Sequence, residues 1–154
     1  MAISIRDATP ADAAAISALV RQSARNTIFA NGPDDGCNYF LAMNTPAATT
    51  GRMRGNYRYY VAEDEGKVVG MIAMRDNSHL YHLFVDQGYH GHGLGRRLWE
   101  HAQEICRRNG NPGRFTVNST PEAIPIYERF GFVATGEIES RNGLTALPMR
   151  LGPG

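Results

Sequence analysis

The chain has 154 residues, 42% of them hydrophobic, and a formal net charge of +1 at pH 7. This length and composition indicate one domain with a single core, at residues 3–151, and the balanced charge argues against nucleic acid or an anionic membrane as the main partner. The chain shows no basic segment followed by an apolar one at its start and no run of ~18 apolar residues, so we expect a soluble cytoplasmic protein.

The N-terminal third predicts a strand, a helix and a long connection. Residues 3–6 suit a strand, and the helix that follows has Thr9 as a good N-cap and Pro10 at its first position. Between residues 31 and 56 the breakers Asn-Gly-Pro, Asp-Gly and Asn-Thr-Pro recur. We therefore expect a long connection there, with one short helix around residues 38–43, of the type that often contributes to binding.

A three-stranded meander and a helical crossover are predicted next. Residues rich in β-branched and aromatic side chains, separated by short polar turns, mark strands at 57–62, 67–74 and 79–85. Apolar residues then recur at helical spacing until an Asn-Gly pair at position 109 ends the helix. Residues 114–117 form a strand reached through this helix, so it should run parallel to the strand at 79–85.

The end of the chain predicts a short helix and two strands. Gly131 suits the left-handed position after the helix, and Phe132 supplies the apolar contact that follows. Strands are expected at residues 133–139 and 144–151, joined by a hairpin turn whose signal is the pair Asn-Gly at 142–143.

The most informative stretch is residues 81–97, because an apolar strand runs into a loop of alternate glycines and then opens a helix. Gly91, Gly93 and Gly95 would let main-chain N–H groups approach an anion, and the free N–H groups of the helix start would complete a phosphate site. Arg96 and its neighbouring arginine lie at the positive end of the helix dipole, which becomes favourable when an anion binds there. A glycine-rich turn that merely joins strand to helix is the alternative.

The loop reads His90-Gly91-His92-Gly93-Leu94-Gly95. It resembles the acetyl-CoA signature of the GNAT superfamily of N-acetyltransferases, although His90 stands where that family usually has Arg or Gln. A second stretch resembles the family's downstream motif, with Asn118 closing the strand after the crossover and then Ala123, Tyr127, Glu128, Arg129, Phe130, Gly131 and Phe132. The resemblance implies an α/β (α+β) fold, with a mixed, mainly antiparallel twisted sheet of six to seven strands, about four helices and a splayed central pair of parallel strands.

The resemblance also implies transfer of an acetyl group from acetyl-CoA to a primary amine of a small molecule or peptide, in a ternary complex and without a metal. Main-chain groups of Leu83, Phe84 and Val85 would pair with the pantetheine arm, with the Val85 N–H facing the thioester oxygen. The implied pyrophosphate-binding set is His90, Gly91, His92, Gly93, Leu94, Gly95 and Arg96.

Two further roles follow from the resemblance. Asn118 would hydrogen-bond the pantetheine or the incoming substrate, and Tyr127 would donate its proton to the departing thiolate. Without the resemblance, Asn118 is an ordinary turn residue and Tyr127 an ordinary core aromatic with a polar tip.

The general base is less well defined by the sequence. Because a strand alternates its faces, His79 and Tyr81 would lie on one face and His82 on the other. At most one of the two histidines would then reach the substrate, and we favour His79. A water molecule is an alternative, as are the carboxylates of Asp86, Glu63 and Glu65.

No metal site and no reactive cysteine are expected. His90 and His92 lie in the phosphate loop, and no third ligand is close to them in sequence. Cys37 and Cys106 lack a CxxC partner, so we expect reduced, structural thiols.

Two other functions remain open. One is an acyl-CoA-binding sensory or structural module without turnover. The other is a dinucleotide enzyme with the loop in a Rossmann unit, which is disfavoured by the antiparallel meander before the loop and by the lack of an acidic residue at the end of strand 114–118. The sequence leaves the amine acceptor and the acyl-chain length undefined, and a homodimer is an open possibility in this superfamily.

Overall fold

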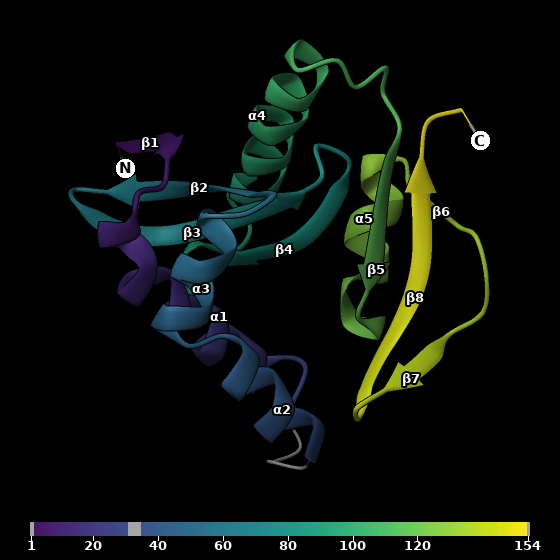
Figure 1. The fold of residues 1–154 in the computed structure, drawn as a ribbon, viewed down its shortest axis with the longest axis horizontal. Coiled ribbons are helices and arrows are strands. Elements are labelled where there is room, and N and C mark those ends of the chain that lie inside the picture. The colour runs from purple at the N-terminus through teal and green to yellow at the C-terminus, as the bar shows by residue number, and fades with distance from the viewer. Residues whose placement is uncertain (1, 31–34, 154) are drawn as a thin grey trace.

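The computed structural model of the chain describes residues 2–30 and 35–153 and shows a mixed sheet flanked by helices (Figure 1). The described residues form eight strands in the order β1-β2-β3-β4-β5-β8-β6, with β7 paired to β8 outside this path. The strands are β1 (Ile3–Asp7), β2 (Tyr57–Asp64), β3 (Lys67–Arg75), β4 (His79–Val85), β5 (Phe115–Ser119), β6 (Val133–Ala134), β7 (Glu139–Arg141) and β8 (Leu144–Leu151). The α-helices are α1 (Ala13–Asn26), α2 (Asp35–Met43), α3 (Pro46–Met53), α4 (Leu94–Arg108) and α5 (Ile124–Phe130), and the 3-10 helices are η1 (Pro10–Asp12), η2 (Gln87–Tyr89) and η3 (Pro121–Ala123).

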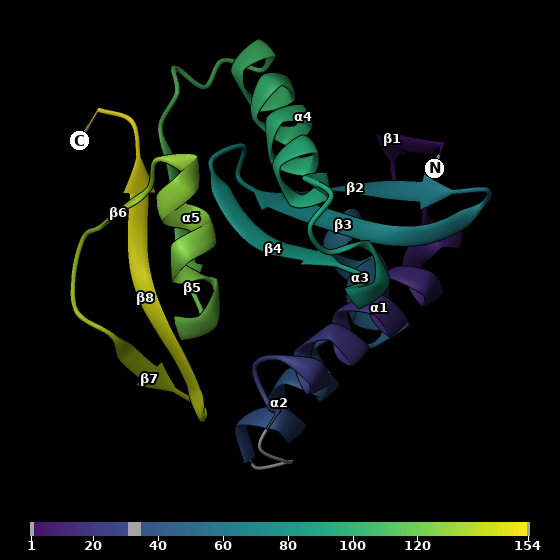
Figure 2. The same cartoon turned by 180° about the vertical axis from the view of Figure 1, so that it is seen from behind.

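The sheet is antiparallel except at its centre. β4 and β5, which α4 connects, run parallel, so the mixed, mainly antiparallel sheet and the parallel pair are confirmed. The two strands share only two residue pairs, His79 with Thr116 and Leu80 with Val117. Beyond these pairs they separate: β5 continues beside β8 (Figure 1), while Figure 2 shows β4 curving away towards β3. The predicted splay is therefore present at the centre of the sheet.

The elements differ from the sequence prediction in two places. The connection at 31–56 contains two helices, α2 and α3, where one short helix was expected, and residues 31–34 of that prediction lie outside the described part. Helix α3 begins because Thr45 Oγ1 accepts a hydrogen bond from the Ala48 N–H at 3.2 Å and Pro46 occupies a first-turn position. The strand expected at 133–139 is interrupted, since only its two ends pair with β8 as β6 and β7. These differences raise the counts above the expected six to seven strands and four helices.

Apolar cores lie on both faces of the sheet. One core packs α4 and α5 against the sheet and includes Leu98, Trp99, Phe115, Phe132 and Met149. The other packs α1 and α2 against the opposite face and includes Ile16, Val20, Phe40, Val61 and Met71. Both faces of the central strands are thus buried, which explains the continuous apolar run of β3. None of the described helices has the length and apolar character needed to cross a membrane.

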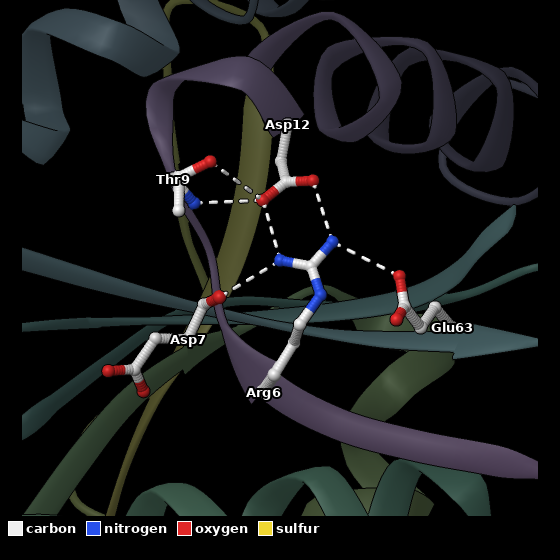
Figure 3. Close-up of polar contacts among 5 residues, drawn as sticks. All are labelled: Arg6, Asp7, Thr9, Asp12 and Glu63. Carbon is white, nitrogen blue, oxygen red and sulfur yellow. Dashed lines mark hydrogen bonds and ion pairs between the residues drawn. The ribbon is translucent and has the colours of Figure 1, made fainter. Parts of the chain in front are cut away.

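A charged cluster ties the N-terminal segment to the sheet (Figure 3). Arg6 on β1 donates two hydrogen bonds to the Asp12 carboxylate, at 2.8 and 2.9 Å, and a third to Glu63 on β2 at 3.1 Å. The Thr9 backbone N–H donates to the same Asp12 carboxylate at 2.8 Å, which caps the start of η1. The Arg6 hydrogen bonds are the largest cause that lowers the pKa of Asp12 to about 2. The cluster therefore fixes the chain where it enters α1.

Candidate functional site

The glycine loop between β4 and α4 leaves its backbone open on one side. Gly91 and Gly93 have φ values of 82° and 73°, in the left-handed region that favours glycine. A Cβ built on either residue would meet no atom within 4 Å. A Cβ on Gly95, in the first turn of α4, would touch only Val85 Cγ2 at 4.0 Å. Backbone conformation, rather than crowding, thus requires glycine at the first two positions, and the space beside them is open.

The first turn of α4 adds unpaired N–H groups to this loop. The Arg97 N–H donates to the Gly93 carbonyl at 3.1 Å. The N–H groups of the three preceding residues, Leu94, Gly95 and Arg96, are therefore too close to the helix start to have a partner within it. No acidic side chain lies in this turn. Free N–H groups at the positive end of a helix dipole, beside open glycines, form a site suited to a phosphate group.

The side chains of this loop are partly engaged elsewhere. His90 Nε2 donates a hydrogen bond to the Val85 carbonyl at 2.8 Å, so the imidazole links the loop to the end of β4. The Arg96 guanidinium donates to the Arg129 carbonyl at 3.2 Å and thereby joins α4 to α5. His92 is exposed. Main-chain N–H groups are consequently the groups of this loop that remain available to an anion.

The second half of β4 is an open edge. Leu83, Phe84 and Val85 pair with β3, but no residue pair joins them to β5. All three residues are half-buried. Their main-chain groups on the β5 side have no ladder partner among the described residues, so an extended ligand with amide groups could pair along this edge as an added strand does.

A β-bulge interrupts β4 where it leaves β5. Ala73 on β3 pairs with His82 while the next residue, Met74, pairs with Leu80, so Tyr81 has no residue opposite it. Leu80 is also the last β4 residue paired with β5. The bulge therefore lies at the point where the two parallel strands separate.

The bulge changes the distribution of side chains on β4. Strict alternation predicts Tyr81 and His82 on opposite faces, but their ring centroids lie 4.2 Å apart. Tyr81 and Phe84 pack on the face covered by α1 and α2, whereas Leu83 packs on the face covered by α4. The prediction that Tyr81 and His82 lie on opposite faces was wrong, because one inserted residue shifts the alternation of every residue that follows it.

Asn118 and Tyr127 belong to the other side of the splay. Asn118 is exposed on β5, one residue beyond Val117, which is the last β5 residue paired with β4. Tyr127 on α5 is 7% exposed, and its ring centroid lies 6.0 and 5.8 Å from those of Phe130 and Phe132. Burial raises the pKa of the Tyr127 hydroxyl above its ordinary value, so this oxygen keeps its proton at neutral pH.

His79 lies at the closed end of the splay. It pairs with Thr116 across β4 and β5, and its Nδ1 is 2.7 Å from the Thr116 hydroxyl. Burial, with a smaller contribution from the Arg75 charge, lowers the pKa of His79 to about 4. The imidazole is therefore neutral at pH 7, but it is separated along β4 from the open edge at residues 83–85.

The three carboxylates considered as alternative bases have structural partners or lie in a turn. Glu63 pairs with Arg6, and Asp86 accepts a hydrogen bond from the Gly88 N–H at 3.0 Å. Glu65 lies in the turn between β2 and β3 with a φ of 51°. No group of three or more His, Cys, Asp or Glu side chains in the described ranges is arranged to hold a metal ion.

Two surface hollows lie away from the loop and the open edge. They are lined by residues at the start of β2, around the turn between β3 and β4 and at the end of α4, among them Asn56, Arg58, Asn77, Cys106 and Asn111. The candidate site is accordingly an open strand edge that continues into the glycine loop at the start of α4.

Sequence reasoning did not single out Arg52, whose guanidinium carbon lies 5.1 Å from the centroid of the Tyr81 ring. The only signal was a cation within a connection that also carries aromatic residues, and the connection was expected to have little regular structure. The contact depends on α3, which packs residues 46–53 against β2.

Comparison with known proteins agrees with this geometry. Residues 28–152 match the family model described as an acetyltransferase (GNAT) domain. The chain is 34% identical over 93 residues to the 5-NmdU N-acetyltransferase of Pseudomonas phage PaMx11. This alignment covers 55% of the chain and 64% of the phage protein, so the chain spans less than two thirds of that relative.

Two solved structures share the fold. The PaiA N-acetyltransferase of Thermoplasma acidophilum, in complex with coenzyme A, matches with a TM-score of 0.80 and 16% identity over 97% of this chain and 98% of that one. The yncA protein of Salmonella typhimurium, with its cofactor acetyl-CoA, matches with a TM-score of 0.70 and 23% identity over 98% and 94% of the two chains. Because the family model spans most of the sequence and the fold agrees throughout, the chain belongs to the GNAT acetyltransferase family.

Proposed function

We propose that the chain is an N-acetyltransferase that moves the acetyl group of acetyl-CoA to a primary amine of a small molecule or peptide, by direct transfer in a ternary complex. The main support is the continuity of two features: the open glycine loop with its free N–H groups leads directly to the unpaired edge of β4. Membership of the GNAT family, and the coenzyme A and acetyl-CoA in two structural neighbours, support the same donor.

In this proposal the pyrophosphate of acetyl-CoA binds the N–H groups from Gly91 to Arg96. The pantetheine arm runs back along β4 from Val85 towards Leu83, where its amide groups pair with the open edge. The thioester end then reaches the bulge at Tyr81, rather than the Val85 N–H that the sequence suggested, because the arm starts at the loop that follows Val85.

Acetyl transfer needs a donor to the developing oxyanion and a proton for the departing thiolate. We assign the first role to a main-chain N–H of β4 near the bulge. Tyr127 is the proposed proton donor, and its raised pKa supports this role because the hydroxyl stays protonated until the thiolate forms. Asn118, exposed on β5 just beyond the paired segment, would hydrogen-bond the pantetheine or the amine substrate.

In this proposal the proton released by the amine is accepted either by His79 or by a water molecule. An alkyl ammonium group has a pKa near ~10 and must lose a proton before it attacks. His79 is neutral at pH 7, since its pKa is lowered to about 4. Its place at the closed end of the splay favours a relay through water over direct contact with the amine.

Calorimetric titration with acetyl-CoA tests the donor site. We expect micromolar binding by the wild type and its loss in the double variant Gly93→Asp/Gly95→Asp, because two carboxylates would repel the phosphate groups. Gly110→Asp is the matched control, since Gly110 also combines a positive φ of 97° with open space but follows the opposite end of α4. Circular dichroism checks that each variant folds. A wild type that does not bind acetyl-CoA would overturn the proposal.

A second candidate is an acyl-CoA-binding sensory or structural module without turnover. The burial of Tyr127 and the position of His79 favour it, because they leave the proton transfers without an exposed side chain. Thiol release separates the two functions: tight CoA binding with no release of free thiol in the presence of any amine would support the module.

Two further predictions concern location and assembly. We expect a cytoplasmic location, which the low cysteine content supports and cell fractionation tests. We also expect a homodimer, which light scattering tests.

A further inference from the structure

Beside the bulge of β4 lies a cluster that the proposed reaction does not use, here called the Arg52 cluster, which comprises Arg52, Tyr57, Tyr59, Tyr81 and His82. Arg52 is in the last turn of α3, and its guanidinium carbon lies 5.1 Å from the centroid of the Tyr81 ring. The Tyr81 ring centroid is 4.9 Å from that of Tyr57 and 4.2 Å from that of His82. Because Tyr81 is the bulged residue, the cluster flanks the point where β4 and β5 separate.

Arg52 has only neutral hydrogen-bond partners in the described part of the chain. Its guanidinium donates to the Met43 carbonyl and, at 3.3 Å, to Asn44 Oδ1. The ion pairs formed among residues 2–30 and 35–153 do not include Arg52. Its side chain is only partly exposed, so water does not fully screen its charge. The cluster therefore carries a positive charge that no described carboxylate balances.

Tyr59, which lies beside Arg52, provides a second indication of a missing partner. Its side chain is 5% exposed, and its hydroxyl has no hydrogen-bond partner among the described residues. Buried hydroxyl groups nearly always have such a partner. Burial raises the pKa of Tyr59 while the nearby Arg52 charge lowers it, so the two groups belong to one site.

His82 and the surrounding rings give the cluster an otherwise apolar and neutral wall. Burial, reinforced by the Arg52 charge, lowers the pKa of His82 to about 3, so its imidazole is neutral at pH 7. The His82 ring centroid lies 5.8 Å from that of Phe40 and 5.5 Å from that of Phe84. The arrangement combines one guanidinium and three tyrosine hydroxyls with aromatic surface, which suits a small anionic group on an organic molecule.

We propose that the amine acceptor carries a carboxylate close to its amine, as an amino acid does, and that Arg52 binds this carboxylate with the Tyr59 hydroxyl as a second donor. The inference rests on the proposed function. A guanidinium binds a carboxylate through two parallel hydrogen bonds, and a tyrosine hydroxyl can donate a third. A carboxylate held beside the bulge brings the amine of the same molecule close to the thioester end of the donor.

The test compares L-amino acids with their own methyl esters, which keep the amine and lack the negative charge. Thiol release from acetyl-CoA gives kcat/KM for each acid and its ester. We expect Arg52→Gln to lower the acid-to-ester ratio of kcat/KM ~10-fold or more, mainly through a higher KM for the acid, because a charge-assisted hydrogen bond is lost. The ratio is measured within one preparation, so a partly unfolded variant does not alter it.

Two variants and a parallel series of acceptors sharpen the comparison. Arg54→Gln is the matched control, because Arg54 is exposed at the end of the same helix and should leave the ratio unchanged. Arg52→Lys keeps the positive charge but lacks the two parallel N–H donors of a guanidinium. Its acid-to-ester ratio of kcat/KM should therefore lie between those of the wild type and Arg52→Gln. Aminophosphonic acids in the parallel series show whether a phosphonate replaces the carboxylate.

The outcomes separate this inference from the proposed function. If amines are acetylated but the acid-to-ester ratio is the same in wild type and Arg52→Gln, the inference fails and the enzyme assignment stands. If no amine releases thiol, the proposed function fails, and thermal shift in the presence of CoA decides the inference. In that case amino acids must raise the Tm of the wild type, their esters must not, and Arg52→Gln must abolish the shift.

Discussion

Replacing Asp12 by Asn should destabilise the chain at pH 7 and do so progressively less at acidic pH. The Arg6 hydrogen bonds lower the pKa of Asp12 from 3.8 to about 2. Because the folded-state pKa lies below the unfolded value, the carboxylate contributes its full stabilisation above about pH 5. This contribution is lost as the pH falls through the folded-state pKa of about 2, where the carboxylate takes up a proton in both states.

The size of this destabilisation follows from the contacts of Asp12 shown in Figure 3. A pKa difference of nearly two units corresponds to ~2.5 kcal/mol in the free energy of unfolding. The Asp12 side chain is 12% exposed but its Arg6 partner is 38% exposed, so solvent weakens the pair and we expect ~1–2 kcal/mol at pH 7. About half of that difference should have disappeared by pH 3, since the unfolded carboxylate is then largely protonated.

Urea unfolding followed by circular dichroism, at several pH values from 7 down to 3, measures this difference. Asp7→Asn is the matched control, because Arg6 contacts the Asp7 backbone carbonyl at 3.0 Å while the Asp7 carboxylate points away from the guanidinium in Figure 3. The control should change the free energy of unfolding by no more than ~0.5 kcal/mol. A destabilisation of Asp12→Asn that does not vary with pH, or an equal effect of the control, would refute the reasoning.

Two further predictions concern catalysis and packing. Tyr127→Phe should lower kcat ~10²-fold or more with little change in the calorimetric affinity for acetyl-CoA, because it removes a proton donor without removing contacts to the cofactor; an unchanged kcat and pH–rate profile would end this assignment. Gly36→Ala should destabilise the fold by ~1–3 kcal/mol in urea unfolding, since its Cβ would overlap the Gly143 carbonyl in the β7–β8 hairpin. Gly51→Ala, in α3 with no atom within 4 Å of the new Cβ, should instead be neutral or stabilise by up to ~1 kcal/mol. Equal effects at the two glycines would contradict the proposed contact.

Local sequence patterns predicted most of the elements well. The meander, the α4 crossover and the final hairpin all appear, and the hairpin turn has the positive φ values, 53° at Asn142 and 76° at Gly143, that its Asn-Gly pair favours. The prediction failed at residues 45–46, where Thr and Pro were interpreted as a break in the chain although they also start a helix. Thr and Pro are common both at the start of a helix and in segments that interrupt regular structure, so the pair alone does not show whether a helix follows.

In the candidate site, too, features that depend on neighbouring residues were predicted, whereas features that depend on contacts between distant residues were not. The glycine loop was recognisable because left-handed φ values and a helix start are properties of neighbouring residues, and Gly91 and Gly93 do adopt them. The sequence favoured His79 over His82 as the general base. Only the pairing with Thr116 reveals that it lies at the closed end of the splay, since that contact joins residues 37 positions apart.

The sequence by itself therefore determined most of the elements, the parallel crossover and the glycine loop that opens α4, because each depends on backbone preferences within a short segment. The tertiary structure alone decided where β4 is bulged, and hence that Tyr81 and His82 lie together near Arg52 of α3. The physical reason is that the register of β4 depends on its pairing with β3, and a shift of one residue there redirects every later side chain.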